Sequence, residues 1–193
     1  MSTGLYGGAF DPPHLGHVEL ARRAKEELGL AELRVLVAAD PGHKHVDTPA
    51  ETRLALARAA FPNDDVELDP APRTIDTLRA PPGWRDPIFL IGADQFCGFP
   101  SWKDPARVLE LTRLGVATRP GFPRDRLDAV LATLTQPERV LFFEIEPYDI
   151  SSREVRARLE RGVDVSAEVP AAVAALIRAQ DLYARPAGYT GRA

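Results

Sequence analysis

Short apolar runs alternate along this chain with segments that have helical periodicity. Four short runs are rich in Val, Ile, Leu and Phe on both faces, which is typical of strands buried within a sheet. They are Leu33 to Ala39, Ile88 to Ile91, Leu114 to Ala117 and Val140 to Ile145. Alternating strands and helices imply a parallel sheet. We therefore expect one α/β domain over residues 1–185, Rossmann-like and doubly wound with a mostly parallel sheet, followed by a C-terminal tail at 186–193.

Capping patterns predict where helices begin. The run Thr48-Pro49-Ala50-Glu51 has the spacing of an N-cap, a first-turn proline and a reciprocal glutamate, so a helix should extend from there to about Ala60. Asp104-Pro105 opens a second helix, and Ser151 with Glu154 opens a third. An earlier helix, over Val18 to Leu28, should turn its charged residues to solvent. Glu19, Arg22, Arg23 and Lys25 are the charged residues that we expect on its exposed face.

Composition excludes several classes of protein. The 193 residues carry a formal net charge of -4 from 24 basic and 28 acidic side chains, so a basic surface for nucleic acid is not expected. The apolar runs fall short of the roughly 18 residues that cross a bilayer, and the first residues lack the pattern of a secretory leader. The single cysteine, Cys97, suits a reducing compartment. We expect a cytoplasmic protein that acts on small molecules, and a homo-oligomer is compatible with the sequence.

The most informative segment is residues 7–17, with the sequence GGAFDPPHLGH. It follows a short first strand and precedes the first helix, and such a glycine-rich turn at a helix N-terminus forms an anion site. His14 and His17 are three residues apart and should lie on one side of the first turn, with Gly16 admitting a ligand to the backbone. The segment is neither a Walker A loop nor a G-x-G-x-x-G fingerprint, so those two classes are excluded.

This segment resembles the signature of the H-x-G-H nucleotidyltransferase superfamily and, more closely, that of the bacterial nicotinate mononucleotide adenylyltransferases. Other segments match that family in order and spacing. They are His43-Lys44, Thr74 to Leu78, Ile91 to Asp94, Phe99 to Lys103, Arg119-Pro120-Gly121 and Ile150 to Arg156. The H-x-G-H and I-S-S-x-x-x-R elements are shared across the superfamily and imply the reaction. The tryptophan at 102, the T-x-x-T-L segment and the R-P-G turn point to nicotinate mononucleotide as the acceptor.

The resemblance implies transfer of the adenylyl group of ATP to nicotinate mononucleotide, with Mg²⁺ carried by ATP and no metal bound by the protein itself. It assigns catalysis to His14, His17, Lys44 and Arg156. It assigns ATP binding to Gly7, Gly8, Ala9, Phe10, Gly16, Gly92, Asp94, Ile150 and Ser151. It assigns nicotinate mononucleotide binding to Thr74, Trp102, Lys103 and Arg119.

The chain departs from the family pattern at Ala9, Gly42, Arg73 and Arg153. Two alternatives therefore stay open: the same chemistry on nicotinamide mononucleotide or phosphopantetheine, and a catalytically silent nucleotide-binding protein. A zinc site built from the four histidines is a weaker hypothesis, because the histidines have no cysteine partner and their loops suit phosphate better.

Overall fold

The sheet has six parallel strands in the order β3-β2-β1-β4-β5-β6. The structure is a computed structural model, and it describes residues 2–42, 46–80 and 83–184. The strands are β1 (Ser2–Gly8), β2 (Leu30–Ala38), β3 (Asp65–Asp69), β4 (Pro87–Gly92), β5 (Arg113–Thr118) and β6 (Val140–Glu144). The chain moves outward in one direction from β1 to β3 and then in the other from β4 to β6. The order therefore reverses between β1 and β4, the position where open parallel sheets bind ligands.

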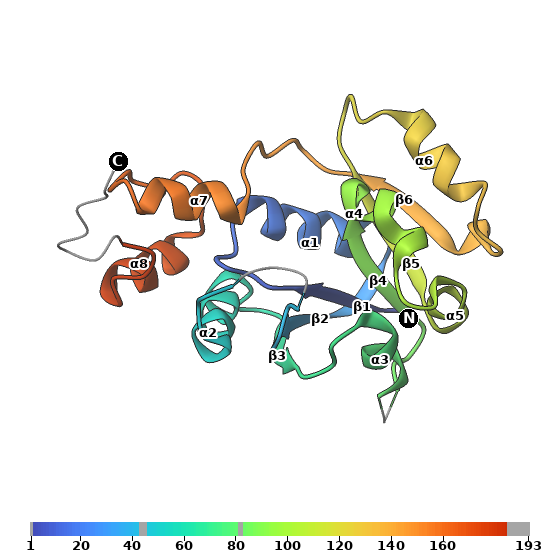
Figure 1. The fold of residues 1–193 in the computed structure, drawn as a ribbon, viewed down its shortest axis with the longest axis horizontal. Coiled ribbons are helices and arrows are strands. Elements are labelled where there is room, and N and C mark those ends of the chain that lie inside the picture. The colour runs from blue at the N-terminus through green and yellow to red at the C-terminus, as the bar shows by residue number, and fades with distance from the viewer. Residues whose placement is uncertain (1, 43–45, 81–82, 185–193) are drawn as a thin grey trace.

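Helices cover both faces of the sheet, which confirms the expected Rossmann-like α/β fold (Figure 1). They are α1 (Leu15–Glu27), α2 (Ala50–Ala60), α3 (Thr74–Arg79), α4 (Ala93–Gly98), α5 (Pro105–Leu111), α6 (Arg124–Leu131), α7 (Ser152–Leu159) and α8 (Ala171–Ala179). Two short 3₁₀ turns follow α4 and precede β6, at Phe99–Ser101 and Pro137–Arg139. After β6 the chain runs past α1 to the α7–α8 pair, which lies beside α2 at the far end of the molecule from α5 (Figure 1).

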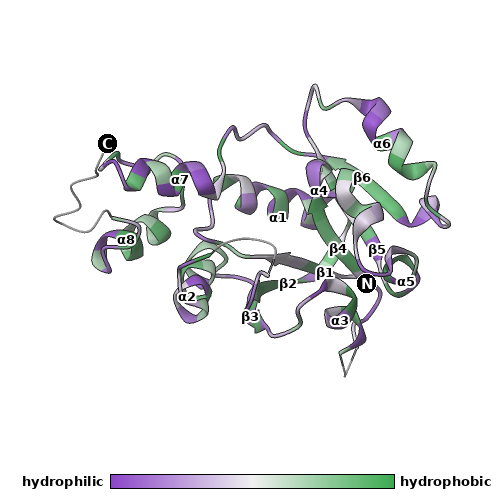
Figure 2. Ribbon diagram, viewed as in Figure 1, coloured by the Kyte–Doolittle hydropathy of each residue, from purple (hydrophilic) through white to green (hydrophobic). Residues whose placement is uncertain are grey.

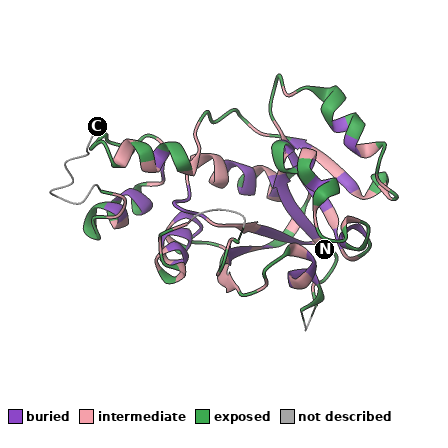
Figure 3. Cartoon of the chain, viewed as in Figure 1, coloured by how far each residue is buried: buried purple, intermediate pink, exposed green. Residues whose placement is uncertain are grey.

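The buried side chains form two clusters, one on each face of the sheet. Along β4, Ile88 and Leu90 join the cluster under α1, α2, α7 and α8, whereas Phe89 and Ile91 join the cluster under α3 to α6. Successive residues of a strand point to opposite faces, so a strand covered on both sides is apolar at every position. Figure 2 shows β4 in green, and Figure 3 shows this strand buried beneath helices with exposed outer surfaces.

Two helix starts confirm the capping predictions and one does not. Asp104 accepts a hydrogen bond from the amide of Arg107, and Ser151 accepts one from the amide of Glu154. The predicted N-cap at Thr48 is wrong, because Pro49 keeps an extended ψ of 145° and the helix begins at Ala50. Strand β3 has no counterpart among the predicted strands, since only Val66 and Leu68 are apolar in its five residues.

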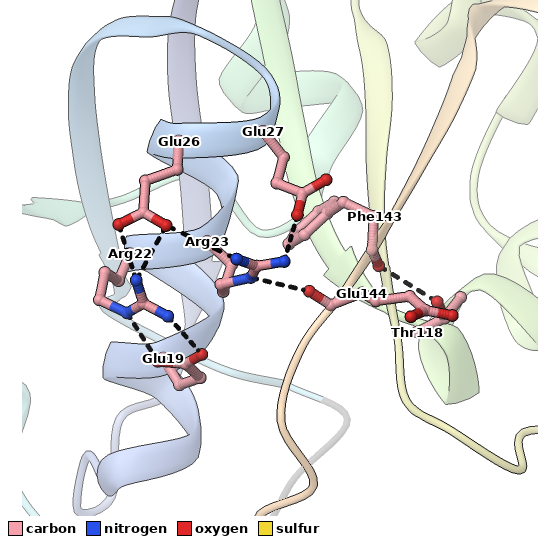
Figure 4. Close-up of polar contacts among 8 residues, drawn as sticks. All are labelled: Glu19, Arg22, Arg23, Glu26, Glu27, Thr118, Phe143 and Glu144. Atoms are coloured by element: carbon pink, nitrogen blue, oxygen red, sulfur yellow. Dashed lines mark hydrogen bonds and ion pairs between the residues drawn. The ribbon is translucent and has the colours of Figure 1, made fainter.

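Charged residues on α1 form a network that ties this helix to the far edge of the sheet. Arg22 bonds both Glu19 and Glu26, and Arg23 pairs with Glu27 and donates to the Glu144 carbonyl at the end of β6 (Figure 4). The prediction that Glu19 faces solvent is wrong, because it is only 9% exposed. Its burial is tolerated because the Arg22 guanidinium binds both carboxylate oxygens and lowers the pKa of Glu19.

None of the helices within the described ranges is both long and apolar enough to cross a membrane.

Candidate active site

Residues 7–17, here called the signature segment, lie at the carboxyl end of β1, directly beside the carboxyl end of β4. β1 ends at Gly8 and α1 begins at Leu15, whereas β4 ends at Gly92 and α4 begins at Ala93. Asp94 is exposed at the start of α4. The structure thus brings the histidine segment and the Gly92–Asp94 turn to the point where the strand order reverses, as predicted.

The first two glycines of the segment, Gly7 and Gly8, belong to β1 rather than to the turn that follows it. A Cβ at Gly7 would lie 3.0 Å from Cζ of Phe89, and one at Gly8 would lie 3.1 Å from the ring of Phe10. Glycine is needed here because aromatic rings pack directly on the strand. The Phe10 ring itself is 2% exposed and packs on Tyr6 and Phe61. Any contact of Phe10 with ATP would therefore be made by its backbone.

His17 is oriented by the backbone of His14. The amide of His14 donates a 3.1 Å hydrogen bond to Nδ1 of His17. An imidazole nitrogen that accepts a hydrogen bond carries no proton, so the neutral ring holds its proton on Nε2. The His17 ring packs edge-on against the ring of Phe10, with centroids 5.3 Å apart. This arrangement prepares Nε2 of His17 as a hydrogen-bond donor.

His14 is held in its neutral form. Its ring lies 3.7 Å, centroid to centroid, from that of His17, and its Nδ1 atom is buried with no hydrogen-bond partner among the described residues. Burial lowers the pKa of His14 to about 4, and the charge of Glu154 opposes the shift only in part. A buried polar atom without a partner is rare in native proteins, and a catalytic role or a bound water or ion is among its explanations.

The shifted pKa of His14 predicts a loss of stability in mild acid. The unfolded chain protonates this imidazole below about pH 6.5, whereas the folded chain does so only near pH 4, so folding is weakened as pH falls through that window. The contribution is at most about 3 kcal/mol. Urea unfolding of the wild type and His14→Asn at pH 7.5 and pH 4.5 measures it. The wild type should lose more free energy of unfolding than the variant; equal losses would contradict the assignment.

The helix start itself offers fewer amides than the sequence suggests. An anion site at a helix N-terminus uses exposed backbone amides, but the amide of Leu15 donates a 2.8 Å bond to the carbonyl of Glu168, from the connection between α7 and α8, so that expectation is wrong at this residue. The amides of His17 and Val18 both bond the His14 carbonyl. The room beside Gly16 is also filled, since a Cβ there would meet the His14 ring at 3.1 Å. An anion bound at this helix start would therefore depend largely on side chains.

Helix α7 lies against the signature segment and brings Arg156 to it. Ser152 donates a 2.8 Å hydrogen bond to the Pro12 carbonyl, and Arg156 Nη1 donates one of 2.5 Å to the Asp11 carbonyl. The same nitrogen lies 3.4 Å from Oδ2 of Asp11. The Arg156 side chain remains 28% exposed, so part of the guanidinium can meet a ligand. Ile150 and Ser151 lie just before this helix, half-buried.

Arg53, which the sequence reading missed, ties three segments around the site. This side chain is 2% exposed and donates to four carbonyls, those of Ala9, Ala38, Ala39 and Thr48, at 2.7 to 3.1 Å. It thereby joins the signature segment to both flanks of the connection between β2 and α2. The signal was present, because Arg53 shares a helical face with the apolar Ala57 and Ala60. Asp11 and Tyr183 were also missed, and Tyr183 has no local signal.

The residues predicted to bind the mononucleotide follow β3, β4 and β5, at the same edge of the sheet. Thr74 is the first residue of α3, and Arg119 is exposed after β5, where its carbonyl accepts the Phe122 amide at 3.0 Å. Trp102 is partly buried and stands edge-on to Phe89 and Phe99, which hold its ring in place. Lys103 is exposed. Their contact with a ligand stays a prediction.

Lys44, His43 and His45 lie outside the described residues. Among the residues that are described, no three His, Cys, Asp or Glu side chains converge as ligands for a metal ion. The zinc hypothesis needs His14 and His17, which are described, together with His43 and His45, which are not. Metal analysis of the purified protein is therefore its test.

The sheet order and the histidine segment define a nucleotide-binding α/β protein, and residues 5–158 match the family described as cytidylyltransferase-like. A protein of Thermus thermophilus named "Probable nicotinate-nucleotide adenylyltransferase" is 38% identical, with 95% of this chain and 100% of the relative covered. A protein of Rubrobacter xylanophilus with the same name is 33% identical, with 95% of this chain and 92% of the relative covered. The chain belongs to the cytidylyltransferase-like family and, within it, to the nicotinate-nucleotide adenylyltransferases.

A solved structure shares the fold. It is the Plasmodium falciparum nicotinic acid mononucleotide adenylyltransferase complexed with NaAD, which superimposes with a TM-score of 0.71 at 18% identity and covers 94% of this chain and 97% of that one.

Proposed function

We propose that this chain transfers the adenylyl group of ATP to nicotinate mononucleotide, giving nicotinate adenine dinucleotide and pyrophosphate, a step of NAD biosynthesis. The reaction class is supported by the paired histidines at the point where the strand order reverses. The acceptor is supported by the names of the relatives that match 95% of the chain. The single cysteine suits a reducing compartment, so we infer that the reaction takes place in the cytoplasm.

The chemistry needs little from the protein except position and charge. An oxygen of the mononucleotide phosphate attacks the α-phosphorus of ATP, and the bond from that phosphorus to the bridging oxygen breaks as pyrophosphate leaves. A phosphate monoester has a second pKa near 6, so the nucleophile is ionised at neutral pH and no general base is required. Catalysis then consists of aligning the two substrates and stabilising the charge that develops on the leaving oxygens.

The described residues can meet that charge from two sides. His17, with its proton held on Nε2, and the neutral His14 would donate hydrogen bonds to ATP phosphate oxygens. Arg156 would neutralise the departing pyrophosphate, and the N-terminus of α7 after Ser151 adds a positive dipole. Lys44 would contribute a second cation. Gly92 and Asp94, at the end of β4, would bind the ribose hydroxyls of the adenosine.

Mg²⁺ would enter with ATP, coordinated by phosphate oxygens. The donor set of the signature segment fits this arrangement. Its only carboxylate, Asp11, is 4% exposed and already bonded to Arg156 and Tyr183. Within residues 7–17 no other side chain is a carboxylate, so the protein offers the ion no acidic cage there.

One assay tests the proposal against its alternatives. The purified protein is offered MgATP with nicotinate mononucleotide, nicotinamide mononucleotide or phosphopantetheine, and pyrophosphate release is measured. We expect the highest kcat/KM with nicotinate mononucleotide. A preference for phosphopantetheine would overturn the acceptor assignment, and no release with any acceptor would favour a silent nucleotide-binding protein.

The choice between acid and amide acceptors predicts a role for Arg73. This residue is the exposed N-cap of α3, directly before Thr74. If its guanidinium reaches the nicotinate carboxylate, the charge-assisted bond is worth about 1.5 to 3 kcal/mol, roughly a 10- to 100-fold preference for the acid. Arg73→Ala should then lower kcat/KM for nicotinate mononucleotide far more than for the amide. An unaltered ratio would leave acid recognition to backbone amides and assign Arg73 to the solvated surface.

A further inference from the structure

The carboxylate of Asp11 is buried beside Arg156, and its two oxygens have different partners. Oδ2 lies 3.4 Å from Nη1 of Arg156, and Oδ1 accepts a 2.8 Å hydrogen bond from the hydroxyl of Tyr183. Only 4% of the Asp11 side chain is exposed. A buried carboxylate needs a partner at each oxygen, and here the second partner comes from the other end of the chain.

Tyr183 can act only as a donor in this contact. Burial, and then the charge of Asp11, raise the pKa of Tyr183 well above its usual value, so the hydroxyl keeps its proton. The residue follows α8 with a φ of 63°, a left-handed conformation that residues other than glycine rarely adopt. Such a backbone persists where surrounding contacts hold it, as the hydroxyl bond to Asp11 does here.

The tyrosine therefore limits how Asp11 can meet Arg156. A carboxylate with both oxygens available binds a guanidinium through two parallel hydrogen bonds. With Oδ1 held by Tyr183, Asp11 offers the arginine one carboxylate oxygen at 3.4 Å, together with its carbonyl at 2.5 Å. The guanidinium is anchored by one nitrogen, and its other N–H groups can face a ligand.

We propose that Tyr183 is a positioning residue for Arg156: by holding Oδ1 of Asp11, it limits the ion pair to one carboxylate oxygen and keeps the rest of the guanidinium directed to the leaving pyrophosphate. This inference rests on the proposed function, in which Arg156 binds that group. The C-terminal region makes two other contacts with the segment. The Ser152 hydroxyl donates a hydrogen bond to the Pro12 carbonyl, and the Glu168 carbonyl accepts one from the Leu15 amide. Those contacts act on the backbone, so the carboxylate can be tested separately from them.

Tyr183→Phe removes the hydroxyl and keeps the ring. We expect kcat/KM for ATP to fall roughly 10-fold and inhibition by inorganic pyrophosphate to weaken by a similar factor, with KM for nicotinate mononucleotide unchanged. Thr133→Val is the matched control, because it deletes a hydroxyl that donates to the Val130 carbonyl at the end of α6, away from the signature segment. It should leave all three constants unchanged. The proposal would be overturned if Tyr183→Phe impaired the use of ATP and of nicotinate mononucleotide equally, or if it impaired the use of neither substrate.

A double-mutant cycle separates this inference from the proposed function. In an Arg156→Lys background the further substitution Tyr183→Phe should have little added effect on kcat/KM for ATP, since both changes act on the same guanidinium. Additive losses would show that Tyr183 acts independently of Arg156 and would overturn the inference. If Arg156→Lys and Arg156→Ala both kept the kcat/KM of the wild type, Arg156 would have no part in the proposed reaction. Urea unfolding midpoints confirm that each variant is folded.

Discussion

His17→Ala is expected to lower kcat by about 10²-fold or more while the protein stays folded. Removal of one pre-oriented donor to a developing oxyanion typically costs this much, because the donor acts mainly in the transition state. The side chain is only partly buried and contributes little to the core. Steady-state rates of pyrophosphate release, with both substrates saturating, measure the effect. An unchanged rate would remove His17 from the catalytic residues.

Two further substitutions at this position separate the roles of the two ring nitrogens. Asn can replace Nδ1 as the acceptor for the His14 amide but has no donor at the position of Nε2, so His17→Asn should be as slow as His17→Ala. Gln can place an N–H group near the position of Nε2, so His17→Gln should recover part of the rate. His45→Ala, outside the matched motif, should cost much less. Equal losses at His17 and His45 would revive the zinc hypothesis.

Apolar runs predict the buried strands because a strand that is covered on both faces needs apolar side chains at successive positions. The run Val140 to Ile145 predicts a strand that the structure bounds at Val140–Glu144. Strand β3 escapes the same criterion, because an edge strand pairs on one side only and its alternating acidic residues resemble a loop. Helix starts are predictable where a side chain caps them, as at Asp104, and less so where Pro49 precedes the helix without a cap.

The site was predictable only as far as its parts are close in sequence or share a motif. His14 and His17 meet because they lie three residues apart at a helix start. Glu168 and Tyr183 reach the same segment from more than 150 residues away, through the packing of α7 and α8. No local pattern encodes such contacts, because they depend on how helices at the end of the chain meet a loop near its start.

The stability of the loops around the site depends on Arg53. Its guanidinium is buried and donates to four carbonyls, two at and just after the end of β2 (Ala38 and Ala39), one before α2 and one in the signature segment. Burial lowers the pKa of Arg53, and the nearby charge of Asp11 opposes this shift. Loss of the guanidinium would leave these buried acceptors, and part of the Asp11 charge, without compensation.

Arg53→Met, which keeps most of the side-chain volume, is therefore expected to lower the free energy of unfolding by about 3 to 5 kcal/mol. Arg53→Lys should lose less, since an ammonium group can reach some of the carbonyls but cannot bond all four at once. Arg58→Met is the matched control on the same helix. That side chain is exposed, with one 3.4 Å contact to the Val66 carbonyl, and its loss should change stability by no more than about 0.5 kcal/mol. Urea unfolding of the three variants provides the comparison, and similar losses at positions 53 and 58 would show that the four carbonyls do not depend on Arg53.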